Sequence, residues 1–240
     1  MFFSNRLNYQ YVMATKKKGS DIGEGVESAL SRSEQFFEEN QKIIVRIIFV
    51  ILAIVAIYLG TKKFYLIPKE AEAQSQMFVA EQYFEIDSFN LALYGDGNYS
   101  GFLEIIEDYK ITKSGNLSAY YAGISFLHLG QYEDAIEYLE KFKSSDKMVA
   151  PIAKGAIGDA YIELGEIEKG LNYYYKAVEA SKNNFTTPQY LLKAAHVHEH
   201  LEEYTRAEEV YKQIKSDYPD FARNNNVDKY LSRVRIKLDE

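Results

Sequence analysis

The chain has 240 residues, which fits one or two domains. It carries 28 Lys and Arg against 35 Asp and Glu, a net charge of −7, and this acidic balance excludes a general nucleic-acid binder. It holds no cysteine, which excludes a disulfide scaffold, a thiolate metal site, a cysteine nucleophile and a lipid anchor on cysteine. The mean hydropathy of −0.32 is that of a soluble protein, but it averages over one very apolar segment.

That segment, residues 43–60, holds a single charge, Arg46, in 18 residues. As a helix it would be about 27 Å long, close to the ~30 Å of a bilayer's hydrocarbon core. From Ile47 onward it is apolar on every face, whereas a surface helix of a soluble domain would have a polar stripe. About forty residues precede it, too many for a cleaved signal peptide. We predict a transmembrane helix at residues 43–63; a fully buried core helix is the alternative.

Lysine and arginine near the span set its expected orientation. The segments directly before and directly after the span carry three basic residues each, so they do not decide the orientation. The whole tail, residues 1–46, has seven basic and six acidic residues, a net charge of +1; residues 61–240 have 21 and 29, a net charge of −8. We therefore expect the tail, residues 1–42, in the cytoplasm and the domain at residues 68–240 across the membrane. The reverse topology stays open.

The first twelve residues differ in composition from the rest of the tail. The polar stretch that starts at Met13 would make an ordinary beginning, so we hypothesise that translation starts there and that residues 1–12 are not translated. Residues 20–41 have apolar residues at helical spacing after Ser20, a residue type that caps helices. This pattern predicts a helix that runs into the span. The alternative is a loose tail that becomes ordered only near the bilayer.

Three segments beyond Pro68 align with one another: residues 118–142, 153–177 and 190–214. Their offsets are 35 and 37 residues, and each reads as a helix, a short turn and a second helix. The aligned positions, in order along the unit, are Gly123, Gly158 and Ala195 (small), Phe126, Tyr161 and His198 (bulky), Ala135, Gly170 and Ala207 (small), and Leu139, Tyr174 and Tyr211 (bulky).

This pattern resembles the tetratricopeptide repeat, a helical hairpin of about 34 residues. Pro219 stands where the repeat usually carries its closing proline. The departures are a missing tryptophan in the first helix, replaced by Ala119, Lys154 and Leu191, and no closing proline in the first two units. The resemblance implies an all-α solenoid of stacked hairpins.

A fourth, divergent unit is predicted before these three. Residues 70–84 read as its first helix and residues 99–109 as its second, with a stretch at 88–97 that is longer than a normal repeat turn. Residues 226–238 read as an amphipathic helix that caps the array. The expected repeats are thus about 70–110, 116–149, 151–184 and 188–221, with the capping helix at 226–238.

Catalytic motifs are not convincing in this sequence, and we predict a non-enzymatic protein without a cofactor. Ser144 and Lys147 have a Ser-x-x-Lys spacing but stand in a polar stretch between repeats. Gly95 and Gly97 lack the strand and third glycine of a dinucleotide-binding loop.

Three histidines invite a metal hypothesis, because His196 and His200 lie one helical turn apart with Glu199 and Glu203 near. The metalloprotease spacing fails, since the position that needs a second histidine after His198 is Glu202. We expect His198 in the repeat core and the other two on the wall of a groove, and predict no metal site. A metal site, a pH-sensitive groove and a metal-dependent hydrolase are the alternatives.

Stacked hairpins bind extended or helical peptides on the concave face that their first helices line. The expected lining is Tyr120, Ile124, Leu127, His128, Ile152, Asp159, Ile162, Glu163, Leu192, His196, Glu199 and His200. Repeats that grip chaperone carboxylates use Lys and Asn at such positions, and this set has neither. We expect a mixed apolar and acidic surface, suited to partly unfolded polypeptide or a partner helix.

The order of parts, a cytoplasmic tail, one anchor and then repeats, resembles the YfgM-like family, an ancillary subunit of the bacterial Sec translocon. The resemblance implies a single-pass inner-membrane protein whose repeats lie in the periplasm. It also implies protein partners: the SecYEG channel, a membrane-bound periplasmic chaperone or isomerase, and exported clients. The alternative is a scaffold subunit of another envelope complex, in division or envelope assembly, with one defined partner.

Overall fold

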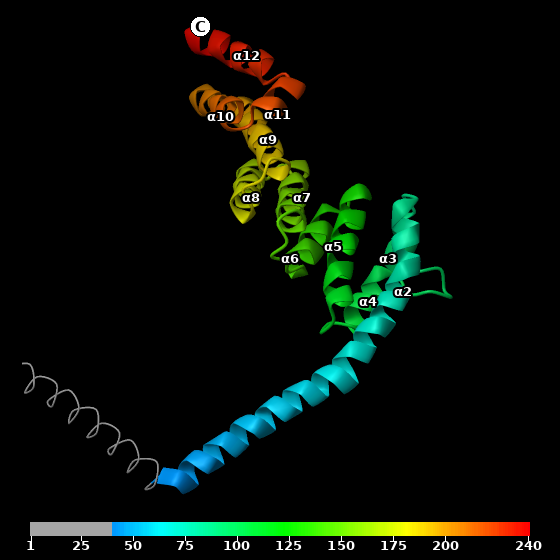
Figure 1. Ribbon diagram of the computed structural model, residues 1–240. Helices are drawn as coiled ribbons and strands as arrows, with labels where there is room; N and C mark the ends of the chain where they lie inside the picture. The colour runs from blue at the N-terminus through cyan, green and yellow to red at the C-terminus, as the bar shows by residue number, and fades with distance from the viewer. Residues whose placement is uncertain (1–39) are drawn as a thin grey trace, which may run out of the picture. The chain divides into compact units, whose positions relative to one another are not determined.

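The computed structural model describes residues 40–240, and the regular elements in this range are all helices (Figure 1). The predictions for the tail before residue 40, including the start at Met13 and nearly all of the helix at 20–41, lie outside the described residues. The chain divides after Lys63 into two compact units.

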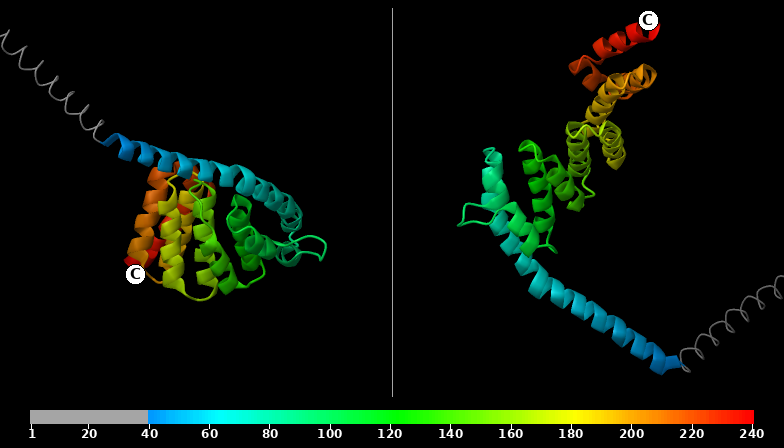
Figure 2. Two further views of the ribbon diagram at one scale, coloured as in Figure 1. Left: turned by 90° about the horizontal axis from the view of Figure 1, so that it is seen from below. Right: turned by 180° about the vertical axis from the view of Figure 1, so that it is seen from behind.

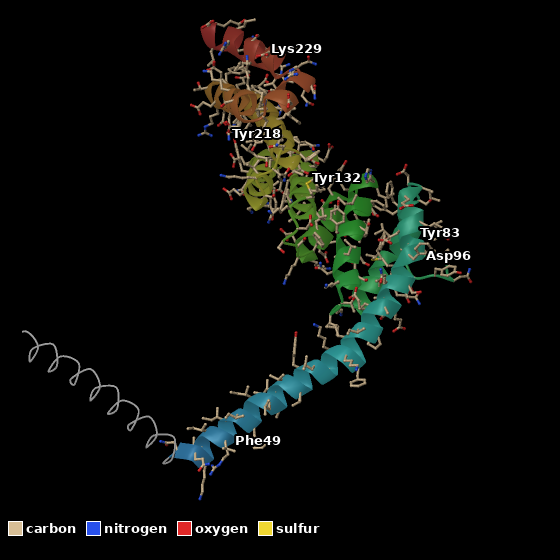
Figure 3. All side chains as sticks on the ribbon, in the orientation of Figure 1. Phe49, Tyr83, Asp96, Tyr132, Tyr218 and Lys229 are labelled. Carbon is tan, nitrogen blue, oxygen red and sulfur yellow. The ribbon has the colours of Figure 1, made fainter. Side chains whose placement is uncertain are left out.

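One helix in the described range, Asn40–Glu85, is long and apolar enough to cross a membrane. Its most apolar 18-residue window has a mean hydropathy of 2.9, and none of that window is buried in the protein. Phe49, labelled in Figure 3, is 67% exposed and projects from the ribbon. The segment is therefore not the buried core helix that the sequence left open.

The helix continues past Pro68, where the sequence led us to expect the repeat domain to begin. A π-helical turn, η1 (Lys62–Leu66), comes directly before α2 (Ile67–Glu85). Proline has no N–H to donate, and its ring crowds the carbonyl four residues earlier, so it normally kinks or breaks a helix. The carbonyl four residues before Pro68 belongs to Phe64, which lies within the wider π turn. The π turn makes room for the proline ring, so the helix passes through the proline without ending.

The first hairpin departs from the expected pattern of two helices and a loop. A short helix, α3 (Phe89–Tyr94), occupies most of the stretch that the sequence assigned to a long turn, and α4 (Phe102–Asp108) begins three residues later than expected. The Asp96 carboxylate accepts hydrogen bonds from the backbone of Asn98 and Tyr99, both at 2.8 Å, and from the Tyr83 hydroxyl at 2.9 Å (Figure 3). Asp96 thus holds this loop in place. Gly95 and Gly97 adopt a positive φ in it, a conformation that glycine reaches without strain.

The three aligned segments form three helical hairpins, as predicted. Their helices are α5 (Lys113–His128) and α6 (Tyr132–Lys141), α7 (Val149–Glu163) and α8 (Ile167–Ala180), and α9 (Thr186–His200) and α10 (Tyr204–Asp217). Each helix packs on the next one along the chain, and first helices also contact each other, α5 with α7 and α7 with α9 (Figure 2). After α11 (Pro219–Asn224), the helix α12 (Val227–Asp239) packs on α10.

Small residues allow the close helix contacts that the repeat pattern requires. A Cβ added to Gly123 would lie 2.5 Å from Leu139 Cγ, and one added to Gly158 would lie 2.7 Å from the Tyr174 ring. Gly155, which the alignment did not single out, is tighter still, because a Cβ there would lie 1.9 Å from the Tyr190 ring of α9. Gly123 and Gly158 thus pack the two helices of a hairpin, whereas Gly155 packs one hairpin on the next.

Candidate functional site

The twelve predicted groove residues all lie on α5, α7 and α9, and we call the surface formed by these helices the first-helix face. None of the twelve is fully buried. The half-buried ones are Tyr120, Ile124, Leu127, Ile152, Asp159, Ile162, Leu192 and Glu199, and the exposed ones are His128, Glu163, His196 and His200. The face therefore offers apolar side chains that are partly open to solvent, with polar groups between them.

Several of these side chains already have partners within the domain. Ile162 lies against Gly170 of α8, so it packs within its own hairpin. The His128 ring stacks on Phe89 of α3, with ring centroids 4.6 Å apart, and Glu163 lies 3.5 Å from the Tyr132 hydroxyl. Tyr120 packs against Phe142, with centroids 5.3 Å apart.

Asp159 joins three helices at the centre of the first-helix face. Its Oδ1 accepts a hydrogen bond from the hydroxyl of Tyr174 on α8 at 2.7 Å, and the same atom lies 2.6 Å from Lys193 Nζ on α9. Tyr174 is only 4% exposed, so its hydroxyl needs a partner within the protein. Burial is the largest cause that raises the pKa of Tyr174, followed by the charge of Asp159, and the phenol stays neutral.

Glu199 repeats this arrangement in the next hairpin. The buried Tyr211, which aligns with Tyr174, donates its hydroxyl to Glu199 Oε1. Arg233 of α12 binds the same carboxylate with Nε and Nη2, both at 2.8 Å. The bidentate bond fixes α12 against α9, because a guanidinium fork and a carboxylate match only in one orientation.

These two ion pairs change the character that the sequence predicted for the surface. Asp159 and Glu199 were expected to make it acidic, but each is matched by a cation within the domain. Lys193 and Arg233 were missed, because nothing in the repeat pattern places a lysine of one hairpin, or an arginine of the capping helix, beside an acid of the hairpin before. Lys193 also lies 5.7 Å from the centre of the Tyr174 ring and 5.9 Å from that of Tyr190, which adds a cation–π contact.

The histidines are directed to different environments. His198 is 3% exposed, which confirms its expected place in the repeat core. Its Nε2 lies 2.8 Å from the Tyr175 hydroxyl and its Nδ1 lies 2.7 Å from Glu203 Oε2. With Glu203 ionised, Nδ1 donates its proton in this contact.

His196 lies at the aromatic end of the face. Its ring meets Tyr230 edge-on, with centroids 4.8 Å apart, and desolvation lowers the pKa of His196, so the ring is neutral at pH 7. Within residues 40–240, no group of three or more His, Asp or Glu side chains is placed to hold a metal ion.

Two hollows lie between neighbouring hairpins, and the twelve predicted residues line neither. One, of about 540 Å³, lies between α6 and α7 and has Phe142, Lys143, Lys154 and Tyr173 among its walls. The other, of about 470 Å³, lies between α8 and α10 and has Tyr175 and His198 among its walls.

Comparison with protein families matches two parts of the chain to models described as tetratricopeptide repeat, at residues 118–146 and 153–184. These two segments are tetratricopeptide repeats. The matches fall within the second and third of the four predicted units, and they account for the small residues and turns found there. The units at residues 70–110 and 188–221 have helical hairpins in the structure and stay predictions as repeats.

Solved structures similar to this chain have the same solenoid fold. One holds nearly identical TPR-like repeats of a Podosopora anserina protein assigned as a kinesin light chain; it is 14% identical, with a TM-score of 0.50, and the match covers 71% of this chain and 93% of that one. A single-substitution variant of that protein matches with the same identity and TM-score, over 71% and 92% of the two chains. At 14% identity these likenesses concern the fold alone. No curated protein matches the sequence significantly.

Proposed function

We propose that this chain is a membrane-anchored tetratricopeptide-repeat adaptor, without enzymatic activity, that binds polypeptide on its first-helix face. The observation that carries the proposal is the face itself, where half-buried apolar side chains lie beside two carboxylates, Asp159 and Glu199, that are already paired with cations. Such a surface takes up apolar stretches of a partner without the cost of burying an unpaired charge. The ligand class is extended polypeptide or an amphipathic partner helix.

The helix at residues 43–63 is proposed as the anchor, with the tail in the cytoplasm and the repeats across the membrane. Its length, its mean hydropathy and its exposure in the structure support this role. A binding face tethered beside a pore meets emerging chains at a high effective concentration, so modest affinity suffices. This reasoning, together with the order of parts, supports a role in protein export and periplasmic folding beside the Sec translocon in a bacterial inner membrane.

Photo-crosslinking in native membranes tests both levels of the proposal. A photoreactive phenylalanine analogue is placed at Leu127 or Leu192 on the first-helix face, and at Asn172 or Glu209 on the second helices as matched controls. Partners are identified by mass spectrometry. We expect crosslinks from the first-helix positions and few from the controls.

The identities of the partners then decide between the candidate roles. Translocon subunits and exported chains among the products support the export role, whereas one other envelope protein would favour the scaffold alternative. Equal crosslinking from the control positions would contradict binding on the first-helix face. Protease accessibility of the repeat domain in spheroplasts checks the topology.

A further inference from the structure

The loops that join one hairpin to the next each carry an exposed apolar side chain near the start of a first helix. Ile111, Met148 and Phe185 are 59%, 40% and 74% exposed and lie 37 residues apart. Each stands at the start of a first helix: Met148 and Phe185 are the capping residues of α7 and α9, and Ile111 precedes the cap of α5. Three exposed apolar residues at the starts of successive first helices point to a common surface.

Hydrogen bonds show that these loops adjoin one another. The Asn116 side chain both donates to the backbone carbonyl of Lys143 and accepts from its N–H, each at 2.9 Å. The Asn183 side chain donates to the carbonyl of Lys147 at 3.1 Å. Residues 109–115, 142–148 and 181–187 therefore form one continuous surface, which we call the loop edge.

The loop edge is basic although the domain is acidic. Its residues include five lysines, Lys110, Lys113, Lys143, Lys147 and Lys182, and one acid, Asp146; the Glu70 carboxylate of α2 also lies on it, at the start of α5. The Asp146 carboxylate accepts hydrogen bonds from the backbone N–H groups of Met148 and Val149, at 2.7 and 2.9 Å, so it is already engaged by the backbone at the start of α7.

The opposite ends of the same helices have the reverse charge. The turns at residues 128–134, 163–169 and 200–206 carry seven acids against one lysine and one arginine, Lys169 and Arg206. An anionic surface would therefore attract the loop edge and repel the turns.

The chain length limits how far one end of the loop edge, at Lys113 and Ser114, can lie from the end of the predicted span. Glu70 on α2 caps the start of α5: its Oε2 accepts from Lys113 N at 2.6 Å, and its Oε1 accepts from Ser114 N at 3.1 Å and Ser114 Oγ at 2.8 Å. Only seven peptide steps separate Glu70 from Lys63, about 25 Å even at full extension. This limit holds whatever the angle between the two units.

We propose that the loop edge lies on the surface of the anionic bilayer that holds the anchor. Ile111, Met148 and Phe185 enter the headgroup region, and the lysines lie beside lipid phosphates. Single apolar residues separated by lysines suit a lipid interface, because each side chain inserts by itself while the charges stay in the headgroup layer. The inference rests on the membrane anchor of the proposed function.

The absence of cysteine gives a direct test, since one introduced cysteine labels a single site. Full-length F185C carries an environment-sensitive fluorophore, and Q131C, in an exposed hairpin turn, is the matched control. Both are reconstituted in vesicles of phosphatidylcholine alone and of phosphatidylcholine with an equal part of phosphatidylglycerol. With phosphatidylglycerol we expect position 185 to be shielded several-fold from a neutral aqueous quencher, and position 131 to stay open.

Charge variants separate lipid binding from nonspecific shielding. A lysine near an anionic surface contributes a factor of about five to the ratio of docked to free domain. Lys110→Gln, Lys147→Gln and Lys182→Gln together should abolish the shielding, as should salt of about 1 M, which shortens the Debye length to about 3 Å. Lys176→Gln, Lys212→Gln and Lys229→Gln together, on other surfaces, should leave it unchanged.

Vesicle flotation distinguishes the possible failures. A chain that does not float with vesicles would overturn the anchor, and this inference with it. A chain that floats, but whose positions 185 and 131 are quenched equally in both lipid mixtures, would overturn this inference alone. Shielding that requires an added protein and is absent in pure lipid would assign the edge to a protein partner and overturn the lipid proposal.

Discussion

Lys193 Nζ of α9 lies 2.6 Å from Asp159 Oδ1 of α7, and the same carboxylate accepts the hydroxyl of Tyr174 from α8. One side chain of the third predicted repeat thus joins its own second helix to the first helix of the following hairpin. Glu199 likewise joins its own second helix, through Tyr211, to the capping helix α12, through Arg233. The solenoid is therefore held between hairpins by polar contacts as well as by apolar packing.

The two partners of Asp159 should contribute unequally to stability. Lys193→Met removes a partly exposed ion pair and should cost less than about 1 kcal/mol. Asp159→Leu also leaves the hydroxyl of the buried Tyr174 without its acceptor, so it should cost about 1–3 kcal/mol. Urea unfolding of the full chain in detergent, followed by circular dichroism, measures both. Equal losses in the two variants would contradict the view that the tyrosine hydroxyl is the costly group.

Glu202 should be replaceable by glycine with a gain in stability. It occupies the turn position of Gly130 and Gly165, and all three have positive φ, 59° at Glu202. A residue with a Cβ pays about 1–2 kcal/mol in this conformation, whereas glycine does not. We expect Glu202→Gly to stabilise the protein by about 1 kcal/mol in thermal or urea unfolding. Glu202→Ala is the control, because it removes the charge but keeps the strain, and a gain of equal size there would refute the explanation.

Gly155→Ala should destabilise the contact between hairpins. The new methyl group would lie 1.9 Å from the Tyr190 ring, and Tyr190 is only 5% exposed and cannot swing away freely. Overpacking of this kind costs about 1–3 kcal/mol, more than the helix propensity of alanine returns. The double variant Gly155→Ala with Tyr190→Leu, in which the ring is gone, should recover part of the loss. No recovery in urea unfolding would argue against the ring as the cause.

The stabilising effect of Glu203 should depend on pH. The hydrogen bond from His198 and the charge of Arg206 lower the pKa of Glu203 below its ordinary value of 4.5. A carboxyl group whose pKa is lower in the folded state stabilises the fold above the unfolded pKa, and the effect is lost as the pH falls through the folded pKa. The difference in urea midpoint between wild type and Glu203→Gln should therefore be present at neutral pH and shrink at a pH of about 3. A difference that stays constant over this range would contradict the assignment.

The sequence alone was sufficient for the three aligned hairpins, the capping helix and their order, but not for α3, α11 or the passage of the first helix through Pro68. Small residues in register at Gly123, Gly158 and Ala195, with a bulky residue one turn later, predicted three hairpins, and an uninterrupted apolar run predicted one membrane-length helix. These signals are local, because each depends on the period of a helix and on the side chains that neighbouring helices can accommodate. The same local reading placed His198 in the core, and its burial confirms this.

Only the tertiary structure decided how the charges are paired and where the helices end. The pairing of Asp159 with Lys193 and of Glu199 with Arg233 depends on the rotation of one hairpin against the next, which no spacing within a repeat encodes. The passage of the first helix through Pro68 depends on a π turn in the preceding residues, and the tightness of Gly155 depends on a ring 35 residues away. Sequence periodicity fixes what a helix can bury, but the contacts between repeats depend on how the helices stack.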